Sequence, residues 1–211
     1  IMIFDIMRMN EWKQPIYFAV TVSPSNQIGL GDFLRMDGQA YQVMPYKVGL
    51  SIDVDVMYDK VIDTYRYANL DDPEVYYPPN VQRLLQNYRK GFLQLVYEYG
   101  LEGDENREKA LHVLHKMDEL VPDETIPVTY MDLYLQIAQM YYQLDDDSSA
   151  YRYMENAFEN GREESPIMDR IKVASIWNDL FDETEQSLDI LLPLSMEAPM
   201  NAQLIYEIAR A

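Results

Sequence analysis

Residues 134–157 carry the clearest hydrophobic pattern in the chain. Apolar and small residues recur every three or four positions on both sides of a short acidic run, residues 145–147. This spacing predicts two antiparallel helices joined by a tight turn. The positions expected to interlock the helices are Tyr134, Ile137, Ala138, Tyr141, Ala150, Met154 and Ala157. Because alanine lets two helices approach closely, we expect these residues at the helix crossing.

The same spacing recurs before and after this pair. In the earlier segment, which closes at Pro122, the matching residues are Phe92, Leu95, Val96, Tyr99, Ala110, Leu114 and Met117. In the later one they are Ile171, Ala174, Ser175, Asn178, Ser187, Leu191 and Leu194. The spacing resembles that of tetratricopeptide repeats, whose helix pairs stack on their neighbours. A closing helix over residues 200–211 should then cover the last apolar face.

Helix-capping residues locate several expected helix starts. Asn80 is the expected N-cap of a helix that runs to about Tyr99. Ser165 is the expected N-cap of a later helix with Pro166 at its first position. Asp182 and Glu185 have the spacing of a capping box at the start of the helix that follows.

The N-terminal third has a mixed pattern that predicts both helices and strands. We expect a short helix over 1–10, a buried strand over 16–22 and a helix over 56–69. Between them we expect one or two helical turns over 29–38, which Gly38 ends, and a strand over 41–46. Pro45 should lie at an edge or at the end of that strand. The proline-rich residues 70–80 are predicted to connect the sheet-containing part to the helical part.

Together these patterns predict a mainly α fold. Residues 1–79 should form a small α/β part with two or three strands. Residues 80–211 should form a tetratricopeptide-like array of antiparallel helices, with units near 80–122, 129–161 and 165–195 and a closing helix over 199–211. In such arrays the first helices line a concave side, which suits an extended peptide or a partner surface. The residues expected there are Lys90, Leu93, Tyr97, Asp132, Leu135, Gln139, Tyr142, Asp169, Lys172, Ile176 and Asp179. A solvated face that binds nothing is the alternative.

Composition narrows the classes of function. The chain has 36 acidic and 17 basic residues and a formal net charge of -19, which disfavours nucleic-acid or anionic-lipid partners. It has no cysteine, so disulfides and thiol chemistry are excluded. No apolar run is long enough to span a bilayer, and no cofactor is expected.

Three acidic or histidine groups are candidates for metal ligation. Asp53 and Asp55 form an Asp-x-Asp pair like those that hold a divalent cation in soluble glycosyltransferases, or Asp55 caps the following helix. His112 and His115 lie three residues apart, without a cysteine or a third histidine to complete a zinc site. Residues 145–147 lack the glycine and distal glutamate of a calcium loop, so we interpret them as a turn that favours the next helix N-terminus. No catalytic residue and no metal site is predicted.

Several motifs resemble those of one bacterial membrane-protein family. They are N-E-W-K-Q-P-I-Y-F-A-V-T-V (10–22), G-L-G-D-F-L-R-M-D-G (29–38), Y-Q-V-M-P (41–45), M-Y-D-K-V (57–61), Y-R-Y-A-N-L-D-D-P (65–73) and N-Y-R (87–89). The resemblance is to the soluble C-terminal region of multi-spanning, protein O-mannosyltransferase-like proteins, long described as a domain of unknown function. Where that family has an arginine before the Pro-Ile-Tyr-Phe run, this chain has Gln14.

The resemblance implies a parent glycosyltransferase of the C-type, with a lipid-linked sugar donor and its catalytic acid in an early membrane loop. It also implies a location on the extracytoplasmic, periplasmic face of a bacterial inner membrane. Under this hypothesis the chain is a non-catalytic helical-repeat domain that makes protein contacts or positions an acceptor. The alternatives are a free-standing peptide- or protein-binding repeat module and a soluble metal-dependent glycosyltransferase that uses Asp53 and Asp55.

Overall fold

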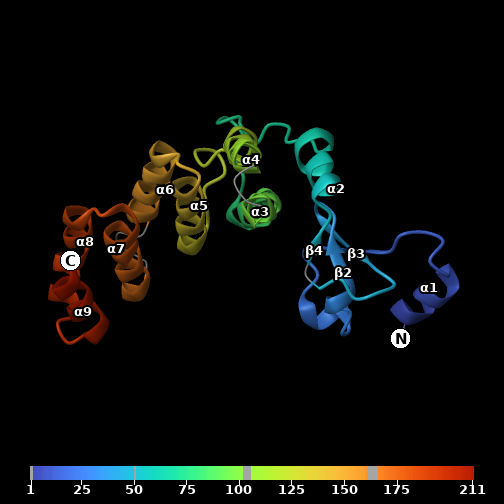
Figure 1. Cartoon of the computed structure of the whole chain (residues 1–211), viewed down its shortest axis with the longest axis horizontal. Coiled ribbons are helices and arrows are strands. Elements are labelled where there is room, and N and C mark those ends of the chain that lie inside the picture. Colours follow the sequence, from blue (N-terminus) through green and yellow to red (C-terminus); the bar gives the residue numbers. More distant parts are fainter. Residues whose placement is uncertain (1, 50, 102–105, 161–165) are drawn as a thin grey trace. The chain divides into compact units, whose positions relative to one another are not determined.

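The computed structural model describes residues 2–49, 51–101, 106–160 and 166–211, and the chain forms two compact units, Ile1–Pro127 and Val128–Ala211 (Figure 1). The predicted fold class is confirmed: a small N-terminal sheet precedes an array of packed helices. The first helix pair belongs to the same compact unit as the sheet, and the later pairs form the second unit.

The sheet of the first unit has four short strands in the described residues, instead of the two or three predicted. They are β1 (Tyr17–Ala19), β2 (Leu34–Met36), β3 (Ala40–Val43) and β4 (Ser51–Ile52), in the order β1-β3-β2-β4. β3 pairs antiparallel with β1 and β2, and β2 pairs parallel with β4. The central strands are therefore the two arms of one hairpin.

Two of the strand and helix predictions for this region are wrong in detail. The strand predicted over 16–22 is only three residues long and is not buried, because β1 lies at the sheet edge with Tyr17 and Ala19 exposed. Residues 29–38 form one 3-10 turn, η2 (Gly31–Phe33), and then enter β2 instead of continuing as a helix. Pro45 follows the end of β3, as expected of a residue that lacks an N–H.

Helix α1 (Met2–Asn10) covers apolar residues of the sheet region. Ile3 and Met7 pack against a small core formed by Leu30, Leu34 and Val43. The remaining large apolar side chains of α1 face away from this core and stay exposed. The predicted short helix is confirmed, and its role is to close one side of the hairpin's core.

The turn of the hairpin is held by residues from distant parts of the unit. The Gly38 N–H contacts the sulfur of Met57 at 2.9 Å, and the Gln39 N–H donates to the Tyr65 hydroxyl at 2.9 Å. The Gln39 side chain donates to the carbonyl of Asn87 at 3.0 Å. These anchors all belong to segments that carry the sequence resemblance, so those motifs contribute to packing around the turn.

Helix α2 (Val54–Tyr58) and the π-helical segment η3 (Asp59–Thr64) replace the single helix predicted over 56–69. The N-cap is Asp53, not Asp55: its Oδ1 accepts the Val56 N–H at 3.2 Å. The helix therefore begins two residues earlier than predicted. It ends at Thr64 because Tyr65 is extended and turns its ring toward the hairpin.

The first helix pair is α3 (Pro79–Leu101) and α4 (Arg107–Leu120). Asn80 lies inside α3 instead of capping it, because Pro79 takes the first helical position, where its missing N–H costs nothing. The predicted packing positions on both helices are at most 6% exposed: Phe92, Leu95, Val96, Tyr99, Ala110, Leu114 and Met117.

The side chain of Arg89 is fully buried and joins α3 to the segment after α4. It donates to Gln86 Oε1 at 2.7 Å, to the Val121 carbonyl at 2.9 Å and to the Ile126 carbonyl. Asp123 lies 4.0 Å from the guanidinium. A buried charge needs such partners, so Arg89 fixes how residues 121–126 fold back over the helix pair.

In the second unit, α5 (Met131–Gln143) and α6 (Asp147–Asn160) form the pair expected from residues 134–157. A three-residue connection makes the two helices antiparallel neighbours (Figure 1). The seven predicted packing residues are at most 2% exposed. Asp146 Oδ1 accepts the Ser149 N–H, which confirms that residues 145–147 form a turn that caps α6.

The last elements are α7 (Ile167–Phe181), α8 (Thr184–Glu197) and α9 (Ala202–Arg210). Ser165 lies outside the described residues, and α7 begins directly after Pro166. The predicted capping box is wrong: Asp182 takes a left-handed conformation (φ 57°) at the end of α7, and Glu183 is the N-cap residue of α8. The two-residue connection therefore uses Asp182 to end α7 and Glu183 to begin α8.

Replacing Gly38 with alanine tests the role of the hairpin turn. Gly38 has a φ of +72°, and an added Cβ would lie 2.1 Å from the Tyr65 hydroxyl oxygen. We expect Gly38→Ala to cost about 1–2 kcal/mol for the backbone conformation and about 1–3 kcal/mol more for displacing Tyr65. Urea unfolding followed by circular dichroism measures the loss.

Gly29→Ala is the matched control, because Gly29 has a φ of +79° but nothing within 4 Å of an added Cβ. It should show only the backbone part of the cost. Equal losses for Gly29→Ala and Gly38→Ala would show that the Tyr65 contact does not stabilise the turn. In a Tyr65→Phe background, the extra cost at Gly38 should shrink.

Candidate interaction surface

The helices α5, α7 and α9 pack successively and present one side of the second unit. Lys172 on α7 pairs with Asp132 on α5 at 2.5 Å. Asp179, two turns further along α7, pairs with Arg210 on α9 at 2.5 Å. Each ion pair bridges neighbouring helices that also pack directly on each other. The α5–α7–α9 surface is defined here by Asp132, Gln139, Lys172, Ile176, Asp179 and Arg210.

The structure brings together the three charged residues of this set that were predicted as candidate binding residues, Asp132, Lys172 and Asp179. Gln139 and Ile176 are half-buried beside them on α5 and α7. Asp169 is half-buried in the first turn of α7. Tyr142 contributes to packing, since its ring lies edge-on to Phe181 with 4.9 Å between the centroids.

The other predicted contact residues have different environments. Leu135 is 2% exposed and Leu93 is 4% exposed, so both side chains belong to the helix cores. Lys90 and Tyr97 are exposed on α3, in the first unit. Positions at helical spacing identify a face, but the neighbouring helix determines which of its side chains reach solvent.

The electrostatics of the surface centre on Arg210. Its guanidinium donates to both carboxylate oxygens of Asp179 and to Glu207 on its own helix. Hydrogen bonds to Asp179 and Glu207 raise the pKa of Arg210 above its usual range. The surface therefore carries alternating, locally paired charges, in contrast to the net charge of -19 for the whole chain.

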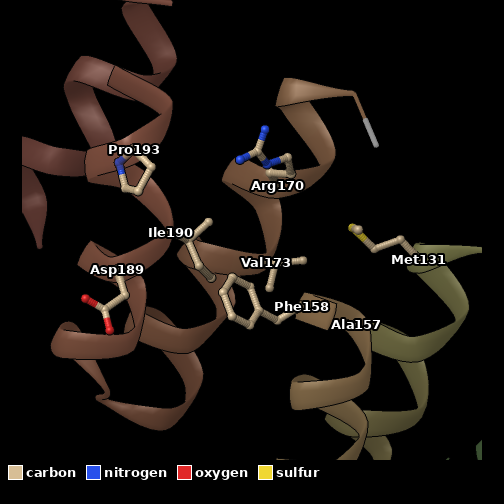
Figure 2. A pocket seen from close by; sticks show the side chains of 8 residues that line it. All are labelled: Met131, Ala157, Phe158, Arg170, Val173, Asp189, Ile190 and Pro193. Atoms are coloured by element: carbon tan, nitrogen blue, oxygen red, sulfur yellow. The ribbon is translucent and has the colours of Figure 1, made fainter. Parts of the chain in front are cut away.

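A cavity of about 230 Å³ lies on another part of the second unit, between α6, α7 and α8. Figure 2 shows the rings and aliphatic side chains of Phe158, Val173 and Ile190 meeting at its centre, with Arg170 and Asp189 at its rim. The remaining lining residues are Met131, Ala157 and Pro193. Arg170 also pairs with Glu197 on α8 at 3.0 Å, which ties one wall of the cavity together.

A second cavity of about 430 Å³ shares the residues Phe158, Asp189 and Ile190 with the first. One of its walls is Tyr151 on α6, whose hydroxyl donates to Glu183 at 2.8 Å. This hydrogen bond, with burial and the nearby carboxylates, raises the pKa of Tyr151 to about 12. Tyr151 thereby links α6 to the start of α8.

The metal-site candidates have structural partners or exposed positions. Asp53 caps α2 with one carboxylate oxygen and lies 3.3 Å from Arg35 with the other. Asp55 is exposed on α2, and His112 and His115 are exposed on α4. No group of three or more potential metal ligands occurs in the part of the chain that the structure describes.

Residues 1–63 match the model of a family described as TMEM260-associated domain 2. The matched segment contains the sheet, the hairpin turn and α2, and it ends within η3. No curated protein and no solved structure was found to match the chain. The resemblances to O-mannosyltransferase-like proteins and to tetratricopeptide repeats are not tested by this match and stay predictions. Over the described ranges, no helix is both long and apolar enough to cross a bilayer.

Sequence reasoning missed Arg210 and the cavity between α6, α7 and α8. Arg210 lies in the closing helix, which was expected only to cover an apolar face. A signal for its role was present, because α9 places Gln203, Glu207 and Arg210 on one side at helical spacing. The cavity depends on how α6 and α8 each pack against α7, and no local spacing in the sequence predicts that packing.

The Tyr151–Glu183 bond predicts a pH dependence of stability. An unfolded tyrosine has a pKa near 10, and the folded value is higher. The stabilisation is therefore fully present below about pH 10 and is lost as the pH rises through about 12. We expect Tyr151→Phe to lower the free energy of unfolding by about 1 kcal/mol at neutral pH, and the difference from wild type to vanish toward pH 12.

Urea unfolding between pH 8 and pH 12 measures the free energy of unfolding of the wild type and of Tyr151→Phe. The matched control is Tyr130→Phe, which lies in the same unit. A constant difference between Tyr151→Phe and wild type across this pH range would contradict the role assigned to the bond.

Proposed function

We propose that this chain is a non-catalytic accessory region of a TMEM260-type membrane protein. The match of residues 1–63 to a TMEM260-associated domain carries this proposal. In the motifs that resemble the O-mannosyltransferase-like family, several residues anchor the hairpin turn and therefore serve the fold. Met57, Tyr65 and Asn87 are the anchors in question.

In this proposal the α5–α7–α9 surface makes the protein contacts. Its paired charges and half-buried Gln139 and Ile176 offer polar and apolar groups side by side. Such a mixture suits a polypeptide that supplies both backbone hydrogen bonds and apolar side chains. The partner is either the rest of the parent protein or an acceptor polypeptide that the surface positions. The proposed location is the extracytoplasmic face of the bacterial membrane.

A free-standing peptide-binding module uses the same surface and differs only in having no linked membrane protein. A metal-dependent glycosyltransferase is less well supported, because Asp53 is held by Arg35 and by the N-terminus of α2. A cation bound by this carboxylate would compete with the Arg35 guanidinium or with the Val56 N–H, and with both in bidentate geometry.

Photo-crosslinking in the full-length native protein tests the proposal. A photoreactive amino acid replaces Gln139 on the α5–α7–α9 surface, and in a matched variant it replaces Glu159, which is exposed on α6. We expect position 139 to crosslink the membrane-embedded part of the same protein or a defined acceptor polypeptide. Charge reversal at the neighbouring Lys172→Glu should weaken this product several-fold.

Crosslinking from position 159 should be much weaker than from position 139. Equal products from the two positions, or none from position 139 in membranes that contain the full-length protein, would contradict a contact role for this surface. A native gene without membrane-spanning segments would favour the free-standing module.

A further inference from the structure

The second cavity of the C-terminal unit, of about 430 Å³, has aromatic walls. Tyr151 and Phe158 lie at positions i and i+7 on one face of α6, and Trp177 is contributed by α7. Ile190 of α8 completes the apolar part of the lining. Figure 2 shows Phe158 and Ile190, which this cavity shares with the first one. Three rings thus line a space whose volume lies within the range of small-molecule sites, about 300–1,000 Å³.

The rings of Tyr151 and Trp177 are held in place by contacts with their neighbours. Trp177 is 4% exposed, and the centroid of its ring lies 5.4 Å from that of Tyr151 and 5.3 Å from that of Phe181. The Tyr151 hydroxyl donates to Glu183 at 2.8 Å. A wall fixed in this way loses little conformational freedom when a ligand binds, so more of the interaction energy appears as affinity.

The polar part of the lining is acidic. Glu155 on α6 and Asp189 on α8 are exposed, as is Gln186, so these side chains lie where the cavity meets solvent. Among the described residues, no basic side chain belongs to the lining, and neither carboxylate is held by an ion pair. The mouth of the cavity therefore favours a positively charged ligand over an anion.

A quaternary ammonium group matches both the rings and the carboxylates. It carries a positive charge without an N–H, so it gives up no hydrogen bond to water when it moves against an aromatic wall. Aromatic rings attract such a cation, and its methyl groups add apolar contact. A primary ammonium group has three N–H donors, which rings cannot satisfy as water does. The lining thus favours the quaternary cation.

We propose that this cavity binds a small organic cation with a quaternary ammonium group and no acidic group. The ammonium lies against the rings of Tyr151, Phe158 and Trp177, and the carboxylates of Glu155 and Asp189 balance its charge. The lining residues are not those of the α5–α7–α9 surface, so this inference goes beyond the proposed function and does not depend on it. Because the carboxylates are exposed, binding should weaken as the salt concentration rises.

Titration of the whole chain with choline tests the proposal. Ligand-observed NMR measures binding, and the fluorescence of Trp177 in a Trp12→Phe background reports whether the ligand reaches this cavity, since the chain has two tryptophans. The uncharged isostere of choline, with carbon in place of nitrogen, should bind at least about fivefold more weakly. Phosphocholine, the headgroup form of the same cation, should also bind more weakly, because its phosphate would approach the two carboxylates.

Charge and ring variants locate the ligand. Combining Glu155→Gln with Asp189→Asn should weaken choline binding by about twofold to tenfold, and the exposed positions of both residues keep the fold intact. Phe158→Leu should weaken it by about twofold to tenfold through loss of a ring. Glu159→Gln is the matched control, because Glu159 is an exposed acid on the same helix outside the lining. It should bind choline like wild type.

Three results would overturn the proposal. The wild-type chain does not bind choline, or it binds the uncharged isostere equally well, or neither the charge variant nor Phe158→Leu weakens binding. In the last case the ligand would occupy another part of the chain. Tighter binding of phosphocholine than of choline would overturn the assignment of a free cation and point to a lipid headgroup. Circular dichroism should show the same helix content in all variants.

Discussion

Close approach of paired helices at alanine is the constraint on which the second unit depends. Ala138, Ala150 and Ala157 are completely buried where α5 and α6 pack. Large aromatic rings fill the space on either side: Tyr141 stacks on Tyr153 with 5.8 Å between the ring centroids. Small residues at the crossing and rings beside it fix the distance between the helices. The surface presented by α5 and α7 follows from this packing.

In the first unit, polar anchors join the small sheet to the apolar core of the helix pair α3–α4. The hairpin turn is held by Met57, Tyr65 and the carbonyl of Asn87, and the fully buried Arg89 joins α3 to residues 121–126. Aromatic contacts continue this network, because Tyr88 lies edge-on to both Tyr65 and Tyr67. A short sheet with small apolar faces gains its stability from such connections to neighbouring helices. The helix pair α3–α4 therefore completes the unit that contains the sheet.

The sequence was sufficient to predict the helices of the second unit, because their buried positions recur at regular spacing. Residues 134–157 gave both helices and the acidic turn between them. The sheet was harder to predict: Leu34–Met36 form a strand only because they pair with β3 and β4. Asp53 rather than Asp55 caps α2 because Arg35 also holds it. These are tertiary contacts, which local spacing does not report.

The candidate surface, too, was predicted in part by local spacing and depends in part on tertiary contacts. Spacing predicted the face on which Asp132, Lys172 and Asp179 lie, but it also placed Leu93 and Leu135 there, and both are buried. Spacing places Arg210 beside Glu207 on α9, but it does not predict the pair with Asp179, because those two residues are 31 positions apart. Ion pairs between residues distant in sequence determine which charged side chains meet on this surface, and local spacing does not predict those pairs.

Overpacking a helix crossing is the most direct test of the account. In a Trp12→Phe background, the fluorescence of Trp177 reports unfolding of the second unit alone, since the chain has two tryptophans. We predict that Ala150→Leu lowers the free energy of unfolding of this unit by about 1–3 kcal/mol. Gln136→Leu, at an exposed position on α5, should change it by less than about 0.5 kcal/mol. Equal, small effects of both substitutions would contradict the claim that alanine at the crossing sets how these helices pack.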